Sequence, residues 1–138
     1  ASFAAFSDPA RQAQIPDPQD PATHARSRLC WEEVNREPHA RVFALYAALL
    51  ELRRSDPVFR ATRRRSELRV VAVGDVLIVE RCAADGRRRV LGANFGAEAA
   101  SLAALSAHGL GGTLLLATQA PAGDRLPPHA AVIFARDE

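Results

Sequence analysis

The chain has 138 residues, 48% of them hydrophobic and 25% charged, which suits one folded domain, or a small domain joined to part of another, and argues against wholesale disorder. The 18 basic residues are all arginine, and 16 acidic residues leave a formal net charge of only +2, which is too small for the basic surface of a typical nucleic-acid-binding protein. No apolar run approaches the roughly 18 residues that a membrane-spanning helix needs.

The first element is a proline-rich segment. Residues 8–38 contain no glycine, and Pro16, Pro18 and Pro21 lie within six residues of one another. Each proline fixes its own φ and disfavours helix at the residue before it. We therefore expect a stiff, extended, non-helical loop, and a loop this long inside a compact chain is usually functional or packed against another surface.

A helix over residues 36–55 is the clearest element that follows. Asn35 is expected to cap it, and Pro38 is tolerated in its first turn. The helix should end at Ser55-Asp56-Pro57, because a proline disfavours helix at the preceding residue. Two adjoining apolar strips predict that it is covered on more than one flank; they consist of Val42, Leu45, Leu49 and Leu52, and of Phe43, Tyr46 and Leu50.

The remainder of the chain has the pattern of strands. Residues 68–73, 76–82 and 89–95 are apolar and β-branched, and they are separated by Gly74-Asp75 and by Asp85-Gly86, which predicts a hairpin with a type I′ turn. We expect a three-stranded antiparallel meander, followed by strands at 113–118 and 130–135. Residues 99–105 do not decide between helix and strand.

No set of residues has the spacing of a known catalytic or metal site. Glu32 and Glu33 are adjacent and cannot face one another on a helix. The histidines have no Cys or Ser partner in a recognisable motif, and His and Cys do not cluster at ligand spacing. The arginine triplets at 63–65 and 87–89 have no interleaved aromatic residues for stacking on bases. We expect no catalytic residue, no metal and no cofactor in this chain.

Several motifs in the first third together resemble a known family. They are Ser7-Asp8-Pro9, the stretch from Ile15 to Thr23 that reads IPDPQDPAT, and the stretch from Arg26 to Trp31 that reads RSRLCW. In these motifs the chain resembles the C-terminal part of maltooligosyl trehalose trehalohydrolases, glycoside hydrolases of the α-amylase superfamily. Weaker similarities continue at Leu45-Tyr46 to Arg53-Arg54, at Ala93 to Gly96 and at Leu126 to Pro128.

The resemblance implies an α+β segment. Residues 1–60 would be the end of a (β/α)8 catalytic barrel, with the proline-rich loop and the last barrel helix, and residues 66–138 would be an antiparallel all-β C-terminal sandwich. The family's catalytic carboxylates lie upstream of such a segment. The loop would lie near substrate, which makes Asp17, Gln19 and Asp20 candidates for contacts with sugar hydroxyls. Packing against the barrel would fall to Val42, Leu45, Tyr46, Leu49 and Leu52.

The function implied is that of a non-catalytic segment of a cytoplasmic, trehalose-releasing α-glucan hydrolase, which cleaves the α-1,4 bond next to the terminal trehalose of maltooligosyl trehalose. Its partners would be the rest of the barrel and, through the parent enzyme, the glucan; no nucleic acid and no membrane are expected. The alternatives are a segment of a glucan branching or debranching enzyme, a stand-alone β-sandwich binding module and a nucleic-acid-binding protein. We also expect the separate segment to self-associate, because its helix would expose apolar surface.

Overall fold

A computed structural model describes residues 9–12, 14–60 and 68–137 of the chain. These residues form two compact units, residues 1–40 and residues 41–138. Ser7 and Asp8 of the family resemblance, the arginine triplet at 63–65 and the predicted start of the β domain at residue 66 lie outside the described residues. The predicted division of the chain between residues 60 and 66 stays a prediction.

The first unit contains more helix than its prolines suggested. It carries α1 (Pro9–Gln12), α2 (Pro21–Arg26) and the 3-10 helix η2 (Trp31–Asn35). The expectation of a non-helical loop is therefore wrong outside residues 14–20. A proline is compatible with the first helical position, where its missing N–H has no partner to lose. At α2, Pro21 occupies that position and the Asp20 side chain caps the helix.

Helix α3 (His39–Ser55) begins later than predicted, because Asn35 ends η2 instead of capping α3. Its C-terminal end at Ser55 confirms the prediction from Pro57. A single turn, α4 (Pro57–Arg60), follows, and the Oδ1 atom of Asp56 accepts a hydrogen bond of 2.7 Å from the Val58 amide. Asp56 thus lies at the corner between the two helices and satisfies one of the free amides at the start of α4.

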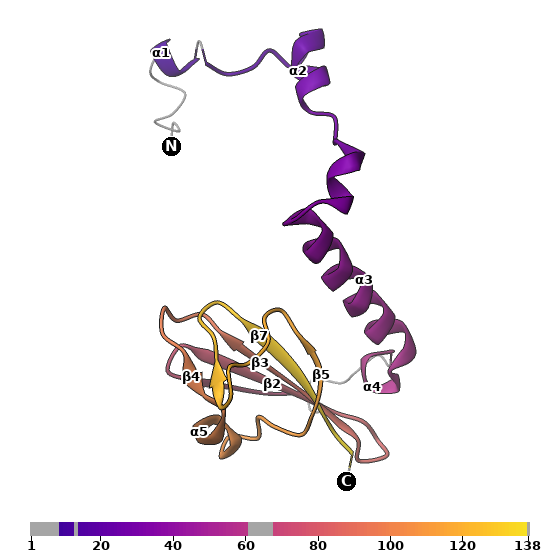
Figure 1. Ribbon diagram of the computed structural model, residues 1–138, viewed down its shortest axis with the longest axis vertical. Coiled ribbons are helices and arrows are strands. Elements are labelled where there is room, and N and C mark those ends of the chain that lie inside the picture. The colour runs from indigo at the N-terminus through magenta and orange to yellow at the C-terminus, as the bar shows by residue number, and fades with distance from the viewer. Residues whose placement is uncertain (1–8, 13, 61–67, 138) are drawn as a thin grey trace. The chain divides into compact units, whose positions relative to one another are not determined.

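The second unit is built on a five-stranded antiparallel sheet of order β1-β2-β3-β7-β5 (Figure 1). The meander β1 (Leu68–Val73), β2 (Val76–Cys82) and β3 (Arg88–Asn94) is confirmed to within a residue. Strand β7 (Ala131–Arg136) pairs with β3 and with β5 (Thr113–Ala117), whose register shifts between Leu114 and Leu116. The predicted later strands are therefore also present.

Both hairpin turns depend on glycine, although one is not of the predicted type. Gly74, at φ 55°, occupies the first position of the two-residue turn between β1 and β2. In the second turn Gly86 has φ 88° but Asp85 does not have a positive φ, so the type I′ prediction is wrong. The Ala83 amide bonds to the Arg87 carbonyl oxygen, which leaves a three-residue loop with a glycine in left-handed conformation, a common alternative.

The hydrophobic core lies on one face of the sheet. A ribbon of β4 (Ala100–Ser101) and β6 (Arg125–Leu126), together with α5 (Leu102–Ser106), covers that face. At Gly92 of β3 an added Cβ would lie 2.7 Å from the Leu110 methyl groups, so the missing side chain makes room for Leu110. The buried members of the core are Val76, Ile78, Val90, Leu105, Leu110, Leu126, Ala130, Val132 and Phe134.

The turn before β5 approaches the sheet backbone closely. Gly112 has φ 120°, and a Cβ added there would overlap the carbonyl oxygen of Ala135 on β7. Gly111, at φ 155°, has open space around the same position. The antiparallel β domain of the predicted fold class is confirmed, with a second layer made of a two-stranded ribbon and one short helix. The barrel end stays a prediction.

Candidate functional site

The loop that the sequence singled out is a pair of side-chain-stabilised turns. The Oδ1 atom of Asp17 accepts a hydrogen bond of 2.9 Å from the Gln19 amide, and the Asp20 amide bonds to the Asp17 carbonyl oxygen. The Oδ1 atom of Asp20 accepts one of 2.8 Å from the Ala22 amide at the start of α2. Aspartate is favoured at both positions because its short side chain can bond to backbone two residues ahead.

These contacts leave surface for a ligand. Asp17, Gln19 and Asp20 are all exposed and follow one another within four positions. Each carboxylate uses Oδ1 for a backbone amide, and within the described residues no hydrogen bond engages Oδ2 of either side chain. The structure therefore brings the three candidates together on one exposed turn, and contact with sugar hydroxyls stays a prediction.

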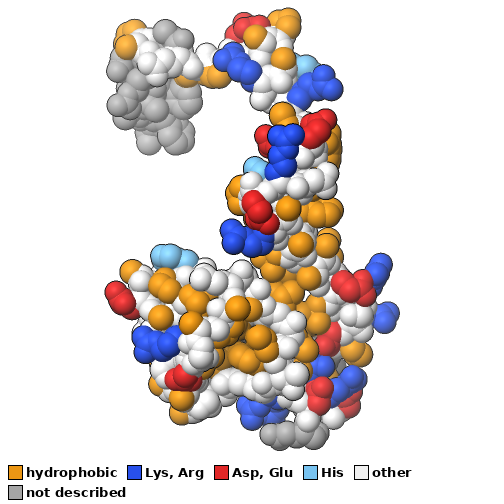
Figure 2. All heavy atoms as spheres, in the orientation of Figure 1, with side chains coloured by type: hydrophobic (Ala, Val, Ile, Leu, Met, Phe, Trp, Pro, Cys, Tyr) orange, Lys and Arg blue, Asp and Glu red, His pale blue; other side chains and the backbone are white. Residues whose placement is uncertain are grey.

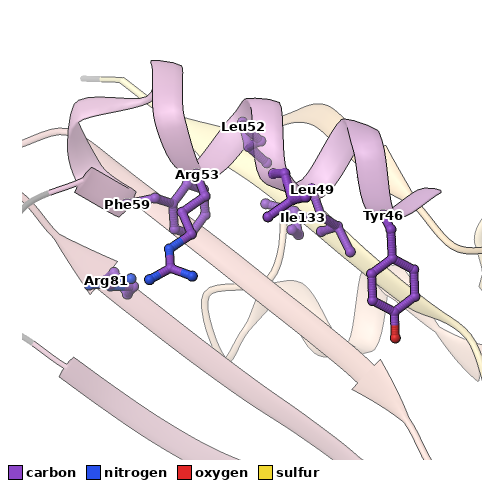
Figure 3. A pocket seen from close by; sticks show the side chains of 8 residues that line it. Tyr46, Leu49, Leu52, Arg53, Phe59, Arg81 and Ile133 are labelled. Carbon is purple, nitrogen blue, oxygen red and sulfur yellow. The ribbon is translucent and has the colours of Figure 1, made fainter. Parts of the chain in front are cut away.

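The two apolar strips of α3 differ in what they meet. Leu49 and Leu52 point toward Ile133 of β7 and, with Tyr46 and Phe59, border a hollow of about 370 Å³ (Figure 3). The guanidinium carbon of Arg81 lies 5.7 Å from the centre of the Phe59 ring, within range of a cation–π contact. One strip of α3 thus faces this chain's own sheet.

The other strip, the outer strip, is largely exposed, although its Tyr46 and Leu50 also border that hollow. Phe43, Tyr46 and Leu50 are 62–64% exposed, and Val42 is 49% exposed. In Figure 2 apolar side chains follow much of the helix surface. Among the residues predicted to pack against a barrel, Val42 and Tyr46 are exposed, whereas Leu45, Leu49 and Leu52 are half-buried. Contact of any of them with a barrel stays a prediction.

Among the described residues two acidic side chains are buried, and arginines neutralise both. Asp56 pairs with Arg89 at 2.6 Å. Glu80 pairs with Arg88 at 3.2 Å and with Arg69 at 3.5 Å. General acid–base hydrolysis needs a carboxylate that can take up or give a proton at the substrate. These two acids serve instead as counterions inside the fold.

Arg89 is held on two sides. Its Nε donates to Oδ2 of Asp56, and its Nη1 donates to Oδ1 of Asp137 at 2.6 Å and to the Arg88 carbonyl oxygen at 2.7 Å. Burial lowers the pKa of Arg89, but the hydrogen bonds and charges of Asp137 and Asp56 outweigh it, so the net pKa is raised. Arg89 stays charged, and it joins the helix corner to the sheet.

Asn94 is a further organising residue that sequence reasoning noted only as part of a family element. Its Nδ2 donates to the carbonyl oxygens of Glu98, Pro127 and Leu126, at 2.8, 3.1 and 3.3 Å. Its Oδ1 accepts a bond of 3.0 Å from the Gly96 amide. The buried amide therefore fixes two loops to the end of β3, while the neighbouring Phe95 is 68% exposed.

The described part of the chain shows no group of three His, Cys, Asp or Glu side chains that could hold a metal ion. Within the same residues, no helix is both long enough and apolar enough to cross a membrane.

Comparison with known sequences gives one family and a consistent set of relatives. Residues 63–133 match the model of a domain of unknown function, DUF3459. Malto-oligosyltrehalose trehalohydrolase from Arthrobacter ramosus is 61% identical over 46 residues, and the enzyme of that name from Rhizobium sp. (strain M-11) is 53% identical over 45. Each of these matches covers 33% of this chain.

A third relative is similar over a longer stretch. Malto-oligosyltrehalose trehalohydrolase from Deinococcus radiodurans is 43% identical over 77 residues, which is 56% of this chain. The matched stretches span only 8% to 13% of the lengths of these three curated relatives.

The fold also has a counterpart among solved structures. A Salmonella typhimurium protein, described as a "Putative alpha Amylase", superposes with a TM-score of 0.69 at 23% sequence identity. The superposition covers 97% of this chain and 24% of that protein. At this level of identity the similarity concerns the fold alone.

Proposed function

The chain belongs to the DUF3459 domain family, and from that premise we propose that it is the C-terminal, non-catalytic segment of a trehalose-releasing α-glucan hydrolase. The parent enzyme would hydrolyse the α-1,4 bond next to the terminal trehalose of maltooligosyl trehalose. The observation that carries this proposal is the 43–61% identity to three proteins named as trehalohydrolases. The α-amylase-like fold is compatible with it.

In this proposal the segment supports a barrel that other parts of the parent polypeptide supply. Helix α3 would be the last barrel helix. Its Leu49 and Leu52 would pack on the β domain, and its outer strip would pack on neighbouring barrel elements. The exposure of Phe43, Tyr46 and Leu50 supports this, because large contiguous apolar surface usually marks an interface. The parent enzyme would be cytoplasmic.

The turn at residues 17–20 would contribute to substrate binding. Loops that precede barrel helices form the substrate face of such enzymes. Asp17 and Asp20 each have one oxygen engaged by the backbone, which holds the carboxylate in place and leaves the second oxygen for a sugar hydroxyl. Gln19 would add an amide that can donate and accept.

The proposal is tested by assaying two polypeptides on maltooligosyl trehalose. The 138-residue chain alone should release no sugar, because in this proposal the catalytic carboxylates belong to the part of the barrel that it lacks. The longer natural polypeptide that carries this segment should release free trehalose. Turnover by the 138-residue chain, or hydrolysis by the longer polypeptide without trehalose release, would contradict the proposal.

The loop is tested separately in that longer polypeptide. Asp20→Asn keeps an oxygen that can cap α2 but removes the charge, whereas Asp20→Ala removes both. If the carboxylate binds a sugar hydroxyl, both variants should raise KM for maltooligosyl trehalose, and Asn should preserve the unfolding temperature. An unchanged KM in both would exclude Asp20 from substrate binding.

A further inference from the structure

A second cavity, of about 680 Å³, lies in the unit of residues 41–138, beside the first turns of α3. Its volume falls within the ~300–1,000 Å³ that is typical of small-molecule sites. Three separate parts of the sequence meet there, namely the start of α3, the end of β5 with the loop after it, and His129. The lining consists of Arg41, Val42, Leu45, Ala117, Thr118, Gln119, Ala120 and His129.

Planar polar groups in this groove are available to a ligand. In the described structure no hydrogen bond or ion pair engages the side chains of Arg41, Gln119 or His129. The hydroxyl of Thr118, by contrast, accepts a bond of 2.9 Å from the Ala131 amide and belongs to the scaffold. Since the side chains of Val42 and Leu45 supply apolar surface beside them, the groove combines hydrogen-bonding groups with an apolar floor.

The backbone at His129 is strained. Its φ of 53° is the one positive value at a non-glycine residue in the described part of the chain. Such conformations cost free energy and are found more often at binding and catalytic sites than elsewhere. No hydrogen bond of the imidazole within the described structure offsets this strain, so the surrounding fold must impose it.

The lining also limits the chemistry of the ligand. It contains no acidic residue, and Arg41 is its one permanently charged group. A neutral ligand rich in hydroxyl groups suits this set better than a polyanion, because guanidinium, amide and imidazole donors can each bond to hydroxyls while the apolar floor meets C–H groups. A short stretch of glucan has both kinds of surface.

We propose that this groove binds glucose units of an α-glucan, away from the bond that the parent enzyme hydrolyses. The identity of the glucan rests on the proposed function. If α3 is a barrel helix, its first turn lies toward the substrate face, because barrel helices begin where the substrate-binding loops end. The groove would then extend the substrate surface onto the β domain.

The experiment measures binding of maltoheptaose to the 138-residue chain by isothermal titration calorimetry, with cellohexaose and inorganic phosphate as comparison ligands. Arg41→Ala, Gln119→Ala and His129→Asn should each weaken maltoheptaose binding about two- to tenfold, the effect of losing one hydrogen bond. Asparagine is chosen at 129 because it tolerates positive φ. The matched control is Arg54→Ala, which removes an exposed arginine paired with Glu51 near the other end of α3.

Binding of maltoheptaose that the three groove variants weaken and Arg54→Ala leaves unchanged would support the inference. Absence of maltoheptaose binding, equal binding of cellohexaose, preference for phosphate, or equal loss in the control would overturn it. The trehalose-release assay decides the proposed function independently. Release of trehalose by the longer polypeptide without maltoheptaose binding here would reject the groove alone, and binding without release would reject the trehalohydrolase assignment alone.

Discussion

Arg89 Nε lies 2.6 Å from Oδ2 of Asp56, which precedes it by 33 residues in the chain. Both side chains are less than a tenth exposed, so the charges face one another away from water. The pair joins the corner between α3 and α4 to the third strand of the sheet. It is the most buried ion pair among the residues that the structure describes.

Removal of the Asp56 carboxylate should be strongly destabilising. Asp56→Ala leaves the buried Arg89 charge with one carboxylate instead of two, and we expect a loss of about 3–5 kcal/mol in the free energy of unfolding. Asp56→Asn should cost less, because its amide oxygen can still cap α4. Asp137→Ala is the control, since Asp137 is 54% exposed and should cost at most about 1 kcal/mol. Urea unfolding curves measure all three, and equal losses would disprove the account.

Asn94 should contribute more to the free energy of unfolding than its exposed neighbour Phe95. Asn94→Ala leaves several buried carbonyl oxygens without a donor, and we expect a loss of about 1–3 kcal/mol. Phe95→Ala should change the free energy of unfolding by about 0.5 kcal/mol or less, because the ring is mainly solvated. Thermal unfolding followed by circular dichroism compares the two variants, and a larger effect at Phe95 would refute the structural role of Asn94.

Gly92 and Leu110 should be energetically coupled. Gly92→Ala places a methyl group 2.7 Å from the leucine methyls and should cost about 1–3 kcal/mol through overpacking. Leu110→Ala should cost about 2–5 kcal/mol by leaving a cavity. Since each change relieves the other, the double variant should be more stable than the sum of the two losses predicts, as chemical denaturation can measure. Strict additivity would show that the two residues do not share this space.

The outer strip of α3 should drive self-association of the separate 138-residue chain. Phe43→Glu with Leu50→Glu should shift sedimentation toward monomer with little change in unfolding free energy, because both residues are 62% exposed. Leu49→Glu is the contrasting change, and it should destabilise the fold because Leu49 lies against Ile133. A wild-type chain that stays monomeric at high concentration would argue against the outer strip as an interface.

The salt bridge between Asp85 and Arg87 in the turn between β2 and β3 should make the stability of the fold slightly dependent on pH in the acid range. Hydrogen bonds from Arg87 lower the pKa of Asp85 below its ordinary value. Stability from this bridge is therefore present above the ordinary aspartate pKa of about 3.9 and is lost as the pH falls through the lower folded-state value. The stability difference between wild type and Asp85→Asn should shrink along that range. A difference that grows in acid would contradict the sign, and its size should be small because the group is exposed.

The strands were predictable from local sequence, whereas the contacts that fix the helix were not. Apolar β-branched runs ended by Gly74 and Gly86 located the meander to within a residue. The Asp85-Gly86 dipeptide predicted the wrong turn type. It indicates where a glycine is needed but not that Ala84 also belongs to the loop. In the first unit the prolines predicted a non-helical loop, whereas at α2 a proline begins a helix.

The remaining features depend on residues far apart in the chain. The width of the apolar surface on α3 indicated two covered flanks, but its periodicity could not show that Leu49 and Leu52 face the sheet while Phe43 stays largely exposed. The pairing of Asp56 with Arg89 has no local signal, since many acids and arginines could pair. His129 was indistinguishable from a surface histidine until its backbone angle and its place beside the second cavity were known.

The two glycines before β5 differ in how freely they can vary. At Gly112 both the backbone angle and the adjacent Ala135 carbonyl oxygen exclude any side chain, whereas at Gly111 the backbone angle alone disfavours one, because the space around it is open. A side chain at position 111 should therefore cost backbone strain alone, whereas one at position 112 would also collide with the backbone of β7. Two adjacent, chemically identical residues would thus evolve at different rates.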